Sequence, residues 1–222
     1  MIDASAVSRA DPLWMRDCRA YVVQADLDEE CRRRLAEAQD RLAGVLPGSV
    51  VCPPASLHVS VAVLLSVRRD YPAPKDALWA QWGSRWCDQL RALAEGFAPF
   101  ELRFERLEVS EAAVIALAGP VAAVESLRRR AAALQRDAGL VAYQPSIVHC
   151  TLLRYGTTGL QLDELGRVAH ATPVRARTVV THLTVRRELV YPSVVSEAVD
   201  RFDLWGRLPD EGRRPPLRAA AR

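Results

Sequence analysis

The chain has 222 residues, of which 50% are hydrophobic and 26% are charged. This composition is ordinary for a globular protein and excludes general disorder, collagen-like repeats and a membrane-embedded chain. The 30 basic and 27 acidic residues leave a net charge of +3, which gives no broad electrostatic footprint for long nucleic acid.

Cysteine usage and the first residues indicate a compartment. The five cysteines are scattered and include no Cys-x-x-Cys pair, which favours reduced thiols in a cytosolic protein. The opening Met-Ile-Asp-Ala-Ser lacks the basic and apolar regions of a signal peptide. The apolar runs are also shorter than the roughly 20 residues that span a bilayer. We therefore expect a cytoplasmic protein with no membrane partner.

The first part of the chain predicts an arm followed by a strand, a helix and a strand. Residues 1–18 have a mixed composition and are expected to form an N-terminal arm. Residues 19–25 predict a strand, and residues 28–43 predict a helix whose apolar residues recur at helical spacing. Residues 57–65 alternate between two faces, one of them apolar, and predict a second strand.

The middle of the chain predicts a similar order. Residues 76–95 predict a helix with tryptophans on its inner side. Residues 100–109 and 114–118 predict strands that pair as a hairpin, residues 120–138 predict a helix, and residues 146–155 predict a strand. The succession strand, helix, strand thus occurs twice, so the chain shows a rough internal duplication of pattern with slight sequence identity.

The last part adds a short helix and further strands. Residues 162–169 predict the helix, and residues 178–186, 189–195 and 198–205 predict strands. Residues 206–222 are expected to form a disordered basic tail. This order of elements predicts an α/β or α+β protein and excludes a helix bundle or a β-sandwich.

Two of the four histidines lie in the same local setting, at corresponding places of the two halves. His58 is followed by an apolar residue and Ser60, and His149 is followed by an apolar residue and Thr151. Side chains two residues apart on a strand share a face, so each motif presents an imidazole beside a hydroxyl. If the halves are related by a pseudo-twofold axis, both motifs line a single cleft.

Phosphodiester chemistry has a use for this arrangement. One neutral imidazole accepts a proton from the attacking water or hydroxyl, and the other, protonated, gives a proton to the leaving oxygen. Histidine suits both tasks because its ordinary pKa is about 6.5. Ser60 and Thr151 can donate hydrogen bonds to the non-bridging oxygens as negative charge develops. Such a reaction requires no metal and no cofactor.

The paired motifs resemble those of the 2H phosphoesterase superfamily, which includes RNA 2′,3′-cyclic phosphodiesterases once named 2′–5′ RNA ligases. His-Val-Ser-Val from His58 is similar to the first motif. His-Cys-Thr-Leu-Leu-Arg from His149 is similar to the His-x-Thr-Leu-x-Arg form of the second. The resemblance covers about residues 19–205, which we expect to form one domain. It implies an α+β fold of two pseudo-symmetric lobes, each an antiparallel sheet with helices outside, around a central cleft.

The resemblance also implies roles for individual residues. His58 and His149 are the implied general acid–base pair, and Ser60 and Thr151 are the implied phosphate ligands. Arg154 follows Thr151 by three residues, so it points to the opposite face of a straight strand. A bulge or the strand end would bring Arg154 to the phosphate, and a surface ion pair is the alternative.

Other residues near these patterns have plainer interpretations. His182 repeats the short pattern as His-Leu-Thr, but it has no counterpart in the duplicated framework and is interpreted as a structural strand residue. His170 lies at a helix end, where capping or exposure is expected. Tyr143 and Tyr155 flank the second motif, and a core or rim position is favoured over stacking on a base.

The sequence therefore predicts a metal-independent phosphoesterase. Its expected substrate is the cyclic phosphate or 2′–5′ phosphodiester of a nucleotide or an RNA end, with opening of a 2′,3′-cyclic phosphate favoured. The alternatives are a non-catalytic binding module of the same fold for nucleotides or RNA ends, and a phosphodiesterase of a non-RNA small molecule. A monomer is the family default.

Overall fold

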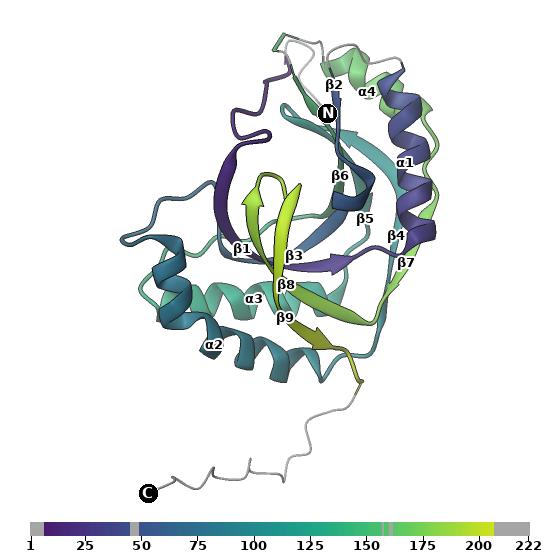
Figure 1. The fold of residues 1–222 in the computed structure, drawn as a ribbon. Helices are drawn as coiled ribbons and strands as arrows, with labels where there is room; N and C mark the ends of the chain where they lie inside the picture. Colours follow the sequence, from purple (N-terminus) through teal and green to yellow (C-terminus); the bar gives the residue numbers. More distant parts are fainter. Residues whose placement is uncertain (1–6, 45–48, 157, 160–161, 207–222) are drawn as a thin grey trace, which may run out of the picture.

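The computed structural model describes residues 7–44, 49–156, 158–159 and 162–206. Within them, two antiparallel sheets form the framework (Figure 1). The four-stranded sheet has, in order, β3 (His58–Leu65), β1 (Asp17–Asp26), β8 (His182–Val190) and β9 (Val195–Asp203). The five-stranded sheet has, in order, β2 (Ser49–Val51), β6 (Val148–Tyr155), β5 (Ala113–Ala118), β4 (Phe100–Val109) and β7 (Ala176–Val180). The predicted two-lobed α+β fold is thereby confirmed.

In the described part of the chain, four helices cover the outer faces of these sheets. They are α1 (Glu29–Ala43), α2 (Lys75–Ala94), α3 (Ala122–Asp137) and α4 (Leu162–Ala171). Helices α1 and α4 pack on the five-stranded sheet, whereas α2 and α3 pack on the four-stranded sheet (Figure 1). Helix α1 follows β1 of one sheet but packs on the other, and α3 follows β5 but packs on β3. The two lobes therefore exchange helices.

Local chemistry explains where α1 begins. The Asp28 carboxylate accepts a hydrogen bond of 2.8 Å from the backbone N–H of Cys31, which satisfies a free donor of the first turn. Glu29 and Glu30 place negative charge at the positive end of the helix dipole. The buried face then repeats at helical spacing through Cys31, Leu35, Ala38 and Leu42.

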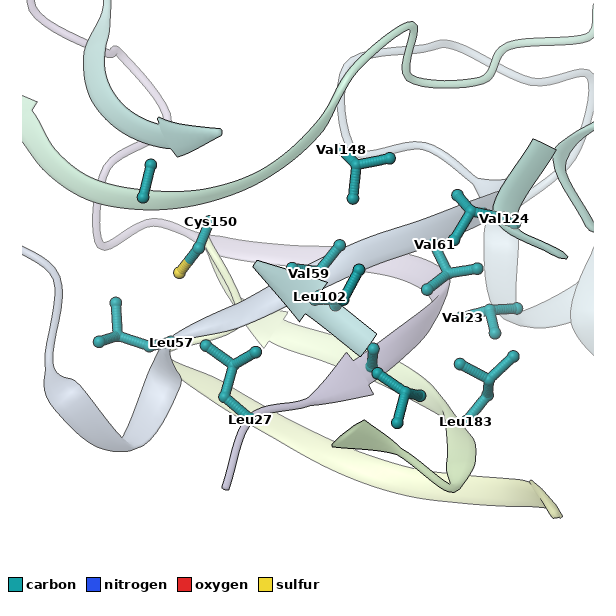
Figure 2. Packing of buried hydrophobic residues seen from close by; sticks show 14 of the residues in the cluster. Val23, Leu27, Leu57, Val59, Val61, Leu102, Val124, Val148, Cys150 and Leu183 are labelled. Atoms are coloured by element: carbon teal, nitrogen blue, oxygen red, sulfur yellow. The ribbon is translucent and has the colours of Figure 1, made fainter. Parts of the chain in front are cut away.

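The strands that carry the two motifs contribute alternate residues to one core. Val59 and Val61 of β3, like Val148 and Cys150 of β6, belong to a single cluster of buried side chains (Figure 2). Because neighbours on a strand point to opposite faces, the residues between them point away from this cluster. The predicted orientation of both motifs is confirmed in this respect.

Two predicted strands near the C-terminus differ from the structure. The predicted strand 178–186 is two strands, because the chain leaves the five-stranded sheet at Thr181 and enters the four-stranded sheet as β8. The alternation of buried and exposed residues holds in β7 and ends at Val180, since residues 183–185 of β8 are all buried, and neither glycine nor proline marks the break. The predicted strand 189–195 is wrong, since residues 191–194 form the turn between β8 and β9.

The described part of the N-terminal arm lies against both lobes. The backbone N–H of Arg9 donates to the Glu111 carbonyl at 2.6 Å, beside the five-stranded sheet. The N–H of Met15 donates to the Tyr191 carbonyl at 3.0 Å, beside the four-stranded sheet. The predicted tail, 206–222, lies outside the described residues except for Gly206. Across the described ranges, no helix has the length and apolar character needed to cross a bilayer.

Candidate active site

The five residues singled out in the sequence come together in one place. A cleft of about 230 Å³ between the two lobes is lined by side chains from β3 and β6, among them His58, Ser60, His149, Thr151 and Arg154. A larger hollow of about 920 Å³ lies between α1, β4 and β7 and contains none of these five residues. We place the candidate site in the smaller cleft because the groups capable of acid–base chemistry converge there.

His58 is held by the turn that precedes its strand. A short 3-10 turn, Pro54–Ser56, brings the Ser56 carbonyl to 2.7 Å from Nδ1 of His58. A carbonyl only accepts hydrogen bonds, so Nδ1 carries the proton and Nε2 is the nitrogen available for chemistry. Ser60 Oγ lies 3.4 Å from this Nε2. The first motif thus places a free imidazole nitrogen beside a hydroxyl.

His149 sits on β6, beside Leu117 of β5, in a different setting. Its Nδ1 is buried and has no hydrogen-bond partner. The nearby Ile147 carbonyl raises the pKa of His149, but Nδ1 donates no hydrogen bond of good geometry to that carbonyl. That carbonyl instead accepts a 2.8 Å hydrogen bond from Arg128. The second imidazole therefore lacks the partner that holds a proton on the first.

Burial lowers the pKa of both histidines, because the charged form loses its hydration. Around His58 the Ser56 carbonyl and the Glu188 carboxylate raise the pKa and so oppose this effect. Around His149 the charges of Arg154 and of His58 itself lower the pKa further. Both pKa values are therefore lowered mainly by burial, and the two histidines differ in the charged and polar groups that add to this effect or oppose it.

A bulge in β6 brings Arg154 into the cleft. Successive residues of β5 pair with Thr151 and Leu153, so Leu152 is an extra residue in the pairing. Leu152 and Leu153 are both buried, which breaks the alternation and returns Arg154 to the face that carries Thr151. Arg154 therefore lines the cleft, which is the position expected for it if its strand contains a bulge.

The sequence analysis did not single out Asp11, Arg68 and Tyr191. Arg68 and Tyr191 line the cleft, and Asp11 is buried in contact with Arg68 and Arg154. The Asp11 carboxylate is fully buried, and its Oδ2 accepts hydrogen bonds from Arg68 at 2.7 Å and from Arg154 at 2.8 Å. The Tyr191 hydroxyl accepts a further bond from Arg68 at 2.8 Å. Arg154 is thus ion-paired, but in the cleft, with its side chain only 12% exposed.

Arg128 of α3 joins the two strands that carry the motifs. This arginine is only 4% exposed. Its Nε donates to the Val61 carbonyl of β3 at 3.0 Å, and its Nη2 donates to the Ile147 carbonyl before β6 at 2.8 Å. One buried guanidinium therefore bonds to the backbone beside both histidines.

The remaining candidates lie elsewhere. His182 begins β8, and its Nε2 is 3.9 Å from the Asp26 carboxylate, outside the cleft. His170 is exposed in the last turn of α4. Tyr155 is buried in the core, whereas Tyr143 lines the cleft with the Arg69 guanidinium 5.4 Å from its ring centre. Among the described residues, His, Cys, Asp and Glu side chains form no group of three that could hold a metal ion.

Among the comparisons with known proteins, the one with solved structures finds similar proteins. No family model and no curated protein matches the chain. TT0787 of Thermus thermophilus superposes with a TM-score of 0.63 at 19% identity, over 86% of this chain and 100% of that one. Escherichia coli LigT complexed with NADP+ gives 0.54 at 15% identity, over 85% and 99%.

A structure described as a phosphoesterase gives a TM-score of 0.55 at 16% identity, over 84% of this chain and 98% of that one. Identities this low show the fold and leave the reaction open. The chain therefore has the two-lobed fold of LigT and these related structures, and the predicted resemblance to the 2H phosphoesterases is confirmed at the level of the fold.

Proposed function

We propose that this protein is a phosphoesterase that hydrolyses the phosphodiester of a nucleotide or an RNA end, with a 2′,3′-cyclic phosphate as its preferred substrate. The observation that carries the proposal is the convergence of two imidazoles, each with a hydroxyl two residues on, in one cleft. The fold supports it, since a structure described as a phosphoesterase shares that fold. LigT, which also shares it, has been crystallised with NADP+, 3′-AMP and ATP.

The two histidines divide the proton transfers between them. His149 accepts the proton of the attacking water as its oxygen bonds to phosphorus. The bond between phosphorus and the leaving ribose oxygen breaks, and protonated His58 gives that oxygen the proton from Nε2. The Ser56 carbonyl and Glu188 favour the charged form of His58, whereas Arg154 disfavours a charge on His149. Exchange with solvent then restores both protonation states.

The other cleft residues stabilise the phosphate as negative charge develops on it. Ser60 and Thr151 donate hydroxyl hydrogen bonds to the non-bridging oxygens. Arg154 adds a guanidinium, whose planar set of donors suits the oxygens of a phosphate. Because the Arg154 guanidinium already donates a hydrogen bond to Asp11, its side chain loses little conformational freedom when the phosphate binds.

Substitution of each histidine tests the proposal, and the chain contains its own control. His58→Ala and His149→Ala are each expected to lower kcat on a nucleoside 2′,3′-cyclic phosphate by about 10²–10⁴-fold, the usual contribution of a general acid or base. His182→Ala removes the histidine of the third His-x-Thr pattern, which lies outside the cleft, and is expected to keep full activity. Wild-type turnover in either cleft variant would reject the mechanism.

A substrate panel identifies the reaction. It contains a nucleoside 2′,3′-cyclic phosphate, a 2′–5′-linked dinucleotide and a phosphodiester without a nucleoside, each assayed with and without EDTA. We expect the cyclic nucleotide to be turned over fastest and EDTA to leave its rate unchanged. Turnover of the non-nucleoside compound alone would identify a small-molecule enzyme. Saturable binding of the nucleotides without product would identify a binding module.

A further inference from the structure

Two arginines from different segments meet at one end of the cleft. Arg68 lies in the connection between β3 and α2, and Arg154 lies on β6. Their guanidinium carbons are 5.3 Å and 5.4 Å from the centre of the Tyr191 ring. Arg68, Arg154 and Tyr191 all line the cleft that contains the two histidines. The contacts with the ring hold both guanidinium groups in place before any ligand arrives.

One buried carboxylate serves both arginines. Oδ2 of Asp11, whose side chain is fully buried, accepts a hydrogen bond from each of them. Two guanidinium groups on one carboxylate leave this cluster with a net positive charge. The charge is accessible through Arg68, whose side chain is 43% exposed. An anion that reaches Arg68 thus meets a cation that is already oriented.

The cluster also has unused hydrogen-bond donors. Nη2 of Arg68 donates to Asp11 and to the Tyr191 hydroxyl. Within the described residues, Nε and Nη1 of Arg68 donate no hydrogen bond, and the buried Nε of Arg154 has no partner. A guanidinium with open donors matches the geometry of a phosphate better than an ammonium group does.

The space around Arg68 extends beyond the histidines. A second hollow of about 390 Å³ adjoins the cleft at Arg68 and is lined further by Tyr71, Leu140 and Val141. A substrate whose scissile phosphate lies between His58 and His149 therefore has room for another group on the far side of Arg68.

We propose that Arg68, held by Asp11 and Tyr191, binds a second phosphate of the substrate, separate from the one that reacts. This inference rests on the proposed function, because it takes the reacting phosphate to lie between the histidines. It narrows the substrate class to nucleotides or RNA ends with a further phosphate next to the scissile one. The N-terminal arm then helps to determine specificity, because it supplies Asp11.

Equilibrium binding tests the inference independently of turnover. Calorimetry compares adenosine 3′-monophosphate with adenosine 3′,5′-bisphosphate as probes. We expect wild type to bind the bisphosphate about tenfold more tightly, as one additional charge-assisted hydrogen-bonded contact would give. Arg68→Gln should abolish this preference and change the affinity for the monophosphate less than about twofold. Arg106→Gln removes the same charge from an exposed residue of β4 that lines neither the cleft nor the second hollow, and should preserve the preference.

The outcomes separate the two proposals. Equal affinity of wild type for both probes would overturn the second phosphate site, as would an equal loss for both probes in Arg68→Gln. Loss of the preference in Arg106→Gln as well would assign the preference to the overall charge of the protein and also overturn the site. A preference that depends on Arg68, in a protein without turnover, would keep the site and reject the hydrolase. Turnover without a preference for the bisphosphate would keep the hydrolase and reject the second phosphate site.

Discussion

At the scale of single residues, the two cleft histidines differ in their surroundings although their motifs are alike. Nδ1 of His58 donates to the Ser56 carbonyl, whereas Nδ1 of His149 is buried without a partner. Glu188 is buried beside the cleft, where it accepts a hydrogen bond from Ser193 and raises the pKa of His58. The proposed roles of acid and base therefore rest on neighbours outside the motifs.

The pH dependence of the reaction follows from these pKa shifts. The free enzyme needs one neutral and one protonated histidine, so kcat/KM should be bell-shaped. Burial lowers the pKa of both groups, so both limbs move toward acid and the maximum should lie below pH ~6.5, the ordinary pKa of histidine. Steady-state kinetics between pH 4 and 9 measure this. A maximum on the alkaline side of that value would contradict the effect of burial.

Sequence reasoning reaches some of these residues and misses others for a physical reason. The imidazoles and hydroxyls follow from the two-residue period of a strand, which is a local property. The ion pairs of Asp11 join residues separated by 57 positions, to Arg68, and by 143 positions, to Arg154. No local pattern marks such a pair, because tertiary packing alone brings its members together.

At the scale of elements, α3 determines how the two motif strands sit beside each other. The sequence predicts this helix from apolar residues at helical spacing, and these residues, Val124, Leu127, Ala131 and Leu134, are all buried. Arg128 lies on the same buried face and bonds to carbonyls of both lobes. These hydrogen bonds offset part of the free-energy cost of burying the charged guanidinium. The spacing of apolar residues in the sequence does not reveal them.

Removal of the Arg128 guanidinium should destabilise the protein. Arg128→Met leaves the Val61 and Ile147 carbonyls without this donor, and we expect the free energy of unfolding to fall by about 3 kcal/mol. Arg129→Met alters the exposed neighbour, which donates a hydrogen bond to Ser126, and should change the free energy of unfolding by less than about 0.5 kcal/mol. Urea titration measures both values. Equal stability of the two variants would show that the bridge between lobes contributes nothing.

Two irregularities in the strands show what the sequence pattern can and cannot predict about individual elements. The bulge at Leu152 coincides with two adjacent leucines, and both are buried because the pairing with β5 skips one residue there. The break at Thr181 has no glycine or proline, and the alternation of β7 ends there, because the chain changes sheets and residues 183–185 of β8 are all buried. The sequence pattern indicates which face of a strand is buried, but it does not indicate which sheet the strand joins.

At the scale of the whole molecule, the exchanged helices make the cleft a product of both halves. Helix α1 packs on the sheet of His149, and α3 packs on the strand of His58. The buried cluster likewise includes residues of both sheets (Figure 2). The sequence predicts two similar halves, but their mutual packing depends on contacts far apart in the chain.

Stability should depend on pH through the same histidines. Their pKa values are lowered in the folded state, so between pH ~6.5 and the folded values the unfolded chain binds more protons. The free energy of unfolding should therefore fall as the pH drops below about 6.5. Urea titration at pH 7.5 and 5.5 measures the difference, which should shrink when both residues are replaced by asparagine. An unchanged difference in that double variant would assign the effect to other groups.

The convergence of both imidazoles on one phosphate can be measured directly by NMR on protein with ¹⁵N-labelled histidine, titrated with adenosine 3′-monophosphate. We expect the ring nitrogens of His58 and His149 to shift with the same dissociation constant and those of His182 to stay in place. A shift of one cleft histidine without the other, or two different dissociation constants, would contradict a shared phosphate.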